Sequence, residues 1–276
     1  MFLITGARGQ LGTELSKRLP GAICTDVDVL DITDEVAVKK FVSSHNIDTI
    51  INCAAYTAVD KAEDNIDQAT KINIDGPKNL AKTGAKIIHI STDYVFDGTS
   101  CKPYTPNDIP NPISVYGKTK YDGEKEVFNN TQVAIIIRTA WLYSQYGNNF
   151  VKTIRRLGTV KDEIGVVADQ IGTPTYAGDL ADAIVKILPQ MNMKNRGIYH
   201  FTNTGVCSWY DFATEIMEQS GLKCVVKPIK SKDYPTRATR PFYSVLDKTK
   251  IIETFGLEIP YWKKSLSKCI AELKES

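Results

Sequence analysis

Short runs of apolar residues alternate with longer amphipathic stretches over the first half of the chain. The runs are rich in Ile and Val and lack polar alternation, which is typical of strands that are covered on both faces of a parallel sheet. We expect strands at residues 2–5, 22–25, 49–53, 86–90 and 134–138. Between them apolar residues recur with the helical period. We expect helices at residues 11–19, 33–44, 67–82 and 116–128, the second of them capped by Thr33 or Asp34.

Strands and helices in alternation predict an α/β fold with a Rossmann-type, doubly wound parallel sheet. After about residue 140 the pattern loosens, and helices are expected only at residues 179–188 and 208–220. We therefore expect a Rossmann domain at residues 1–145, with its sheet completed by later segments. Residues 146–276 form a mixed region that holds the remaining sheet elements and a smaller C-terminal lobe.

Three glycines, Gly6, Gly9 and Gly12, lie between the first expected strand and the first expected helix. In such a loop the early glycine permits a tight turn, the middle one lets the backbone approach a pyrophosphate, and the last allows close helix packing. The N–H groups at the helix start then attract the anion. The pattern predicts a dinucleotide site that includes Gln10 and Leu11, and the alternative is a tight turn that binds no ligand.

Asp26 follows the second expected strand. A carboxylate at this place can accept both hydroxyls of an adenosine ribose, which favours NADH over NADPH. Arg8 in the glycine loop could offset the repulsion of a 2′-phosphate, and Asp26 could also be a simple turn residue.

Further cofactor contacts are expected at the ends of the next elements. The Asp31 carboxylate can take the adenine amino group while Ile32 covers the ring. Ala54, Ala55 and Tyr56 follow the third strand, where the two small alanines let the backbone lie along the cofactor.

Tyr116 and Lys120 lie one helical turn apart on the same face of an expected helix. The phenol, with an ordinary pKa of about 10, can exchange a proton with a substrate oxygen if a nearby cation favours its phenolate. We expect the Lys120 ammonium to be that cation and to bond the nicotinamide ribose. Thr92, at the end of the fourth strand, can bond the same substrate oxygen. The Tyr–Lys spacing alone is common on solvated helix faces, so the prediction depends on Thr92 and the glycine loop occurring with it.

Composition excludes several other classes. The net charge of +2 favours neither nucleic acid nor an acidic membrane surface, and no apolar run is long enough to span a bilayer. The N-terminal residues lack the pattern of a signal peptide. The six cysteines are scattered without a CxxC pair, which is typical of reduced thiols in a cytoplasmic protein. We therefore expect a cytoplasmic enzyme with no nucleic-acid or membrane partner.

Several longer motifs resemble one family of the extended short-chain dehydrogenase/reductases, the dTDP-4-dehydrorhamnose reductases. They cover almost the whole chain: AAYTAVDKAE at 54–63, STDYVFDG at 91–98, PISVYGKTK at 112–120, RTAWLY at 138–143, GNNFVKT at 147–153, DQIGTPT at 169–175, and Arg240-Pro241. The resemblance implies a substrate-binding role for the C-terminal lobe.

The resemblance also implies a reaction. The family uses NADPH or NADH to reduce the 4-keto group of dTDP-4-dehydro-6-deoxy-L-mannose, also called dTDP-6-deoxy-L-lyxo-4-hexulose, giving dTDP-L-rhamnose. It makes Tyr116 the proton donor, Lys120 its electrostatic partner, and Thr92 the group that sets the tyrosine pKa and orients the ketone. The implied sugar-nucleotide contacts are Thr92, Asp93, Trp141, Asn148, Asn149 and Arg240. Core packing is the alternative for Trp141, and an unliganded surface position is the alternative for Arg240.

Other functions within the same branch stay open. Dehydratases of this branch carry Asp-Glu after the threonine, whereas Tyr94 follows Asp93 here, which favours simple reduction. The alternatives are a reductase of a related nucleotide 4-keto-6-deoxy sugar and a non-catalytic NADP-binding regulatory subunit. Some family members hold magnesium at a dimer interface, and Glu14 matches one such position. We predict no metal, because Asp179 stands where a glutamate would be wanted, and we expect Glu14 to be solvated. A homodimer is one possible assembly.

Overall fold

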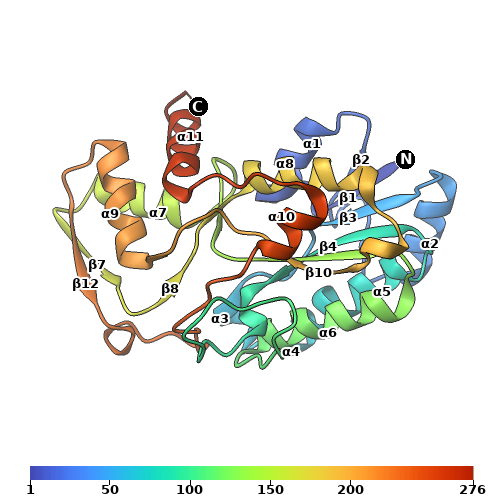
Figure 1. Cartoon of the computed structure of the whole chain (residues 1–276), viewed down its shortest axis with the longest axis horizontal. Coiled ribbons are helices and arrows are strands. Elements are labelled where there is room, and N and C mark those ends of the chain that lie inside the picture. The colour runs from blue at the N-terminus through green and yellow to red at the C-terminus, as the bar shows by residue number, and fades with distance from the viewer. Residues whose placement is uncertain (276) are drawn as a thin grey trace.

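A six-stranded parallel sheet forms the centre of the molecule (Figure 1). The computed structural model describes residues 1–275. The order across the sheet is β10-β5-β4-β3-β1-β2, and every neighbouring pair is parallel. The strands are β1 (Phe2–Thr5), β2 (Ile23–Thr25), β3 (Thr49–Asn52), β4 (Lys86–Thr92), β5 (Ala134–Thr139) and β10 (Gly197–His200).

The chain changes its direction of winding between β1 and β3. From β1 it passes to β2 on one side, and it then returns to place β3 on the other side of β1. Ligands of open α/β sheets bind at such a switch point, outside the carboxyl ends of the strands. The glycine loop after β1 and the Ala54 segment after β3 therefore meet at this point.

Helices cover both faces of the sheet, as two layers of apolar side chains require. One face is covered by α1 and α8, whose Leu11, Leu15 and Leu180 are buried in a cluster that also includes residues of α10. The opposite face is covered by α2, α5 and α6 through Val38, Leu80 and Val127. These helices are α1 (Gln10–Arg18), α2 (Glu35–Ser44), α5 (Gly76–Ala81), α6 (Val115–Asn130), α8 (Ala177–Ile187) and α10 (Thr249–Phe255).

A smaller lobe with its own apolar core lies beside the carboxyl ends of the strands (Figure 1). Val151, Phe212, Leu266 and their neighbours form this core. Its elements are α7 (Phe150–Gly158), α9 (Trp209–Ser220), α11 (Trp262–Glu275) and the parallel pair β7 (Glu163–Val167) and β12 (Val225–Ile229). Two short pairs connect the lobe to the sheet: β6 (Leu142–Tyr143) with β9 (Thr175–Tyr176), and β8 (Ile171–Gly172) with β11 (Cys207–Ser208).

The structure confirms the five strands expected from the apolar runs and, except for the helix at residues 67–82, the expected helices around them. Asp34 is the cap of α2, because its carboxylate accepts a hydrogen bond from the Ala37 N–H. A later segment, β10, completes the sheet as expected. The domain boundary at residue 145 stays a prediction.

The helix expected at residues 67–82 is not one regular helix. It begins as α4 (Ile66–Thr70), widens into a π-helical turn at Lys71–Asp75 and ends as α5. The turn directs the buried Asn73 side chain to the backbone of Tyr56 and to the Thr119 hydroxyl. Apolar periodicity cannot reveal this interruption, because the turn is stabilised by polar contacts to other segments. The sequence also failed to predict the short helix α3 (Val59–Ala62), and α7, α10 and α11.

Candidate active site

A cavity of about 760 Å³ opens at the switch point, between the sheet and the smaller lobe. It extends from the glycine loop, past the end of β4, to residues of α9. Most of the residues predicted for cofactor and substrate line it: Gly6, Gly9, Gln10, Leu11, Gly12, Asp26, Asp31, Ile32, Ala54, Ala55, Thr92, Asp93, Tyr116, Lys120, Trp141, Asn148 and Asn149.

The glycine loop has little room for side chains. Gly6 has a left-handed φ of 65°, and a Cβ there would lie 2.7 Å from the Ala54 nitrogen. A Cβ on Gly12 would lie 2.2 Å from the Gly6 carbonyl oxygen. The loop leads directly into α1, which has no acidic residue in its first turn. The first N–H groups of this helix thus lie at the cavity wall, where they can bind an anion.

Asp26 borders the same end of the cavity. Its carboxylate accepts hydrogen bonds from the backbone N–H groups of Arg8, at 3.2 Å, and Val27, at 2.9 Å. The Arg8 guanidinium turns to Asp28 and forms an exposed ion pair. Asp31 is exposed and accepts two bonds from Thr33, while Ile32 is buried.

Two predicted residues do not line the cavity. The backbone of Tyr56 is held by Asn73, with Tyr56 N–H donating to Asn73 Oδ1 at 2.8 Å. Arg240 is bound in an ion pair, with its Nη2 atom 2.8 Å from Asp60 Oδ2, and its side chain is 25% exposed. Their proposed ligand contacts stay predictions.

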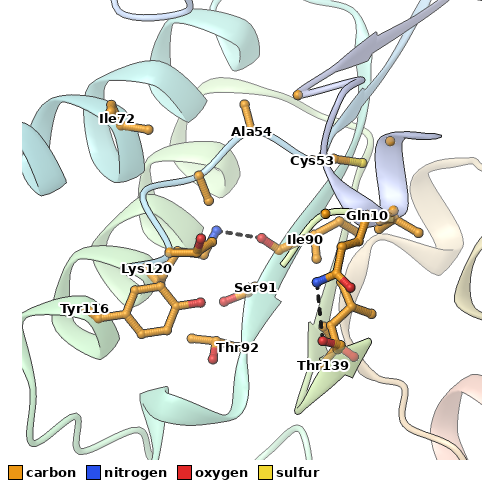
Figure 2. A pocket seen from close by; sticks show the side chains of 18 of the residues that line it. Gln10, Cys53, Ala54, Ile72, Ile90, Ser91, Thr92, Tyr116, Lys120 and Thr139 are labelled. Carbon is orange, nitrogen blue, oxygen red and sulfur yellow. Dashed lines mark hydrogen bonds between the residues drawn. The ribbon is translucent and has the colours of Figure 1, made fainter. Parts of the chain in front are cut away.

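Tyr116, Lys120 and Thr92 converge on the wall of the cavity (Figure 2). Ser114 caps α6 by accepting a bond from the Gly117 N–H, so the tyrosine lies in the first turn of this helix. Gly117 is in close contact with the Tyr94 carbonyl, since a Cβ there would lie 2.1 Å from that oxygen. This approach brings the first turn of α6 against the end of β4. Figure 2 shows the phenol hydroxyl directed towards Ser91 and Thr92.

Burial decides the protonation of these groups. It raises the pKa of Tyr116 to about 12, which a hydrogen bond with Thr92 partly offsets and the charge of Asp93 increases. Burial lowers the pKa of Lys120 to about 8, against the opposing effect of the Glu124 carboxylate. At neutral pH the phenol is therefore protonated and Lys120 is mostly an ammonium.

The expected effect of the Lys120 ammonium on the pKa of Tyr116 stays a prediction. The groups that shift this pKa are the surrounding protein, Thr92 and Asp93. Lys120 Nζ donates to the Ile90 carbonyl oxygen at 2.6 Å (Figure 2). The lysine side chain is 2% exposed and is oriented by the backbone of β4.

Asp93 lies beside Thr92 at the cavity wall and is 2% exposed. The Thr92 hydroxyl donates to Asp93 Oδ1 at 3.1 Å. Burial raises the pKa of Asp93 to about 6, which bonds from the hydroxyls of Ser244 and Thr92 partly offset. The group is therefore mainly an anion at neutral pH and can accept hydroxyl donors.

Trp141 covers one side of the cavity in an uncommon backbone conformation, with a φ of 49°. Its ring stacks on Trp209, with centroids 3.5 Å apart and planes 11° apart. Gly172 contacts the Trp141 ring so closely that a Cβ there would lie 2.7 Å from it. Trp209 is a cavity residue that the sequence analysis did not identify. Its expected helix gave no signal of this contact, because Trp209 and Trp141 come from different elements.

The two asparagines differ in their surroundings. Asn148 is exposed at the cavity edge. Asn149 caps α7, and its amide nitrogen donates to Gln10 Oε1 at 2.9 Å. Gln10 in turn donates to the Leu142 carbonyl oxygen, so these residues connect the glycine loop to the smaller lobe.

Glu14 is not solvated as we expected. It is 3% exposed, is paired with Arg18 and accepts a bond from Gln145 at 2.9 Å. Within residues 1–275, no group of three or more His, Cys, Asp or Glu side chains is placed to hold a metal ion.

Comparisons with known proteins identify the family of the chain. The family model described as RmlD substrate binding domain matches residues 1–275. The dTDP-4-dehydrorhamnose reductase of Aggregatibacter actinomycetemcomitans is 43% identical, and the alignment covers 96% of each chain. This chain belongs to the dTDP-4-dehydrorhamnose reductase family.

Two solved structures extend the comparison. A dTDP-4-dehydrorhamnose reductase from Clostridium acetobutylicum is 48% identical, with a TM-score of 0.95 over 99% of both chains. The enzyme of this family from Bacillus anthracis, solved in complex with NADP, is 42% identical, with a TM-score of 0.94 over 98% of both chains. In the described part of the chain, no helix is both long and apolar enough to cross a membrane.

Proposed function

We propose that the protein reduces the 4-keto group of dTDP-4-dehydro-6-deoxy-L-mannose to dTDP-L-rhamnose with NADPH or NADH. The observation that carries the proposal is the convergence of Tyr116, Lys120 and Thr92 in a cavity that begins at the glycine loop. Membership of the reductase family supports the substrate class. The complex of the Bacillus anthracis relative with NADP supports the cofactor class.

The residues at the glycine-loop end fit a dinucleotide. Gly6 and Gly12 leave no space for side chains, and the N-terminus of α1 supplies unpaired N–H donors for a pyrophosphate. Ala54 and Ala55 form a wall of small side chains beyond the loop. A nicotinamide cofactor bound here supplies the hydride for the sugar carbon.

Tyr116 donates the proton to the ketone oxygen. Its raised pKa keeps the phenol protonated at neutral pH, which is the form that a reduction requires. The carbonyl oxygen becomes a hydroxyl oxygen, and the phenolate that remains recovers a proton from solvent. Thr92 orients the same oxygen, and the Lys120 ammonium stabilises negative charge beside the tyrosine.

Asp93, Trp141 and Asn148 form the sugar side of the site. The Asp93 anion can accept hydroxyl donors of the sugar, while the Trp141 ring offers an apolar face to the ring carbons. Contacts of Asn149 and Arg240 with the sugar nucleotide remain part of the proposal. The Arg240 guanidinium is already paired with Asp60, so a diphosphate would compete with that carboxylate or bind the remaining N–H donors.

The test is NADPH and NADH oxidation with enzymatically generated dTDP-6-deoxy-L-lyxo-4-hexulose, followed by identification of the product by NMR. We expect dTDP-L-rhamnose. We expect Tyr116→Phe to lower turnover at least about a hundredfold, the low end for loss of a general acid. NADPH should still bind to this variant with near wild-type affinity. Near wild-type turnover of Tyr116→Phe would contradict the proposed role.

The same assay separates the alternatives. Turnover of a different nucleotide 4-keto-6-deoxy sugar, without turnover of this one, would identify that other sugar as the substrate. NADP binding without turnover of any such sugar would favour the regulatory-subunit function. A cytoplasmic location, consistent with six unpaired cysteines, and a homodimer are also proposed. Fractionation and light scattering test them.

A further inference from the structure

A buried ion pair lies directly behind the proposed reaction centre. Glu124 and Arg138 are each 1% exposed. Arg138 Nε is 2.9 Å from Glu124 Oε1, and Nη2 is 2.7 Å from Oε2, so the two side chains form a bidentate pair. Removing two charges from water costs about as much as such a pair returns, so stability alone gives little reason for it.

The pair joins the elements that carry the reacting side chains. Glu124 lies one turn after Lys120 on α6. The hydroxyl of Ser91, the residue before Thr92 on β4, donates to Glu124 Oε1. Arg138 lies on β5 directly opposite Ser91, with the next pair of that register formed by Thr92 and Thr139. One carboxylate is therefore bonded to both strands from the helix of the catalytic tyrosine.

We propose that Glu124 and Arg138 are positioning residues of the reduction: their ion pair holds α6, the helix of Tyr116 and Lys120, against β4 and β5. The proposal rests on the proposed function. Neither residue lines the cavity, so both act through Ser91, Thr92 and Lys120.

The Glu124 charge has a second effect, which is on the protonation of Lys120. Cys53, after β3, has a pKa raised to about 12 by burial, and Tyr116 on the same helix is also raised to about 12. His89 on β4 has its pKa lowered well below the ordinary value by burial and by Lys120. These three groups are neutral at pH 7. Asp93 is mainly an anion at this pH, and the pKa values that its charge raises are those of Tyr94 and Tyr116. Glu124 is therefore the anion that opposes the burial of the Lys120 charge.

The first experiment compares Glu124→Gln with Glu126→Gln, a matched loss of one carboxylate from the same helix. Glu126 is partly exposed and pairs with Lys78 at the surface. In Glu124→Gln we expect kcat to fall by up to about a hundredfold, the effect of a small misplacement of reacting groups. The alkaline limb of kcat/KM should move to lower pH, while NADPH affinity is kept. Glu126→Gln should change neither kcat nor the alkaline limb.

Two further variants separate positioning from folding. The double variant Glu124→Met/Arg138→Met leaves no unpaired charge and is expected to fold, since apolar replacement of a buried pair is often tolerated. We expect it to keep the low kcat and the shifted limb. Ser91→Ala creates no stranded charge, so it tests positioning even if the charge variants unfold. We expect a lower kcat with an unchanged limb.

Wild-type turnover of the dTDP sugar is measured first, because its absence would refute the proposed function and not the positioning role. With an active wild type, wild-type kcat and pH profile in Glu124→Gln or in the folded double variant would overturn the proposal. Wild-type kcat in Ser91→Ala would also overturn the positioning claim.

Discussion

The pH dependence of sugar reduction follows from three side chains at the wall of the cavity. Reduction needs a protonated Tyr116, and the pKa of this phenol, raised to about 12 by burial, keeps it protonated throughout the usable range. Lys120 acts as an ammonium, and this form is lost as pH rises through about 8. Asp93 acts as an anion, and this form is lost as pH falls through about 6.

These directions predict a bell-shaped profile of kcat/KM for the sugar at saturating NADPH. Activity should be highest between pH 6 and 8. Each limb should approach a change of about tenfold per pH unit, so activity at pH 9 should be about tenfold below the maximum. The limbs belong to the enzyme before the sugar binds, which is the state that kcat/KM reports.

The assay is the initial rate of NADPH oxidation at low sugar concentration, in overlapping buffers of constant ionic strength. Asp93→Asn should remove the acidic limb, and Lys120→Arg should remove the alkaline limb near pH 8, because a guanidinium stays charged. Both variants should have lower maximal activity. A wild-type profile that is flat from pH 6 to 9.5, or an alkaline limb that persists in Lys120→Arg, would refute the reasoning about Lys120.

Three further predictions concern the walls of the cavity. Asp28→Ala frees the Arg8 guanidinium and should raise the NADPH-to-NADH ratio of kcat/KM by about two- to fivefold, the energy of one exposed ion pair; an unchanged ratio would place Arg8 away from the 2′-phosphate. Trp209→Ala removes the partner of Trp141 and should raise the sugar KM about three- to tenfold at constant NADPH affinity, with Trp209→Phe close to wild type. Gly12→Ala places a Cβ 2.2 Å from a carbonyl oxygen of the loop and should lower the free energy of unfolding by about 1–3 kcal/mol and weaken NADPH binding, measured by thermal unfolding and titration. Gly21→Ala, which meets no atom within 4 Å, is its control, and equal effects in both would contradict the steric argument.

The sequence by itself determined the sheet, the glycine loop and the Tyr116–Lys120 pair. These features depend on local periodicities: continuous apolar runs form buried strands, and residues four apart share a helix face. The structure accordingly places both side chains and Thr92 at one cavity. The same local rules placed the cap of α2 at Thr33 or Asp34, and the structure shows that it is Asp34.

Tertiary structure alone decided how the site is held together. The Ile90 carbonyl accepts a hydrogen bond from the Lys120 ammonium, Trp209 packs on Trp141, and the π turn directs Asn73 to the Tyr56 backbone. The two residues of each pair are far apart in the sequence. Glu14 could not be identified as buried, because its partner Gln145 comes from a distant segment.

The physical reason is the range of the interactions. Helical and strand periodicity can be recognised within a few residues of sequence. Burial, desolvation and the pairing of charges depend on which elements pack together. The pKa of Tyr116 shows the difference, since the sequence pointed to Lys120 and Thr92 as the groups that tune it and carried no signal of the burial of the phenol. The packed protein raises that pKa through burial. It also places Lys120 Nζ in a hydrogen bond to a backbone carbonyl of β4, while the Glu124 charge opposes the effect of burial on the lysine pKa.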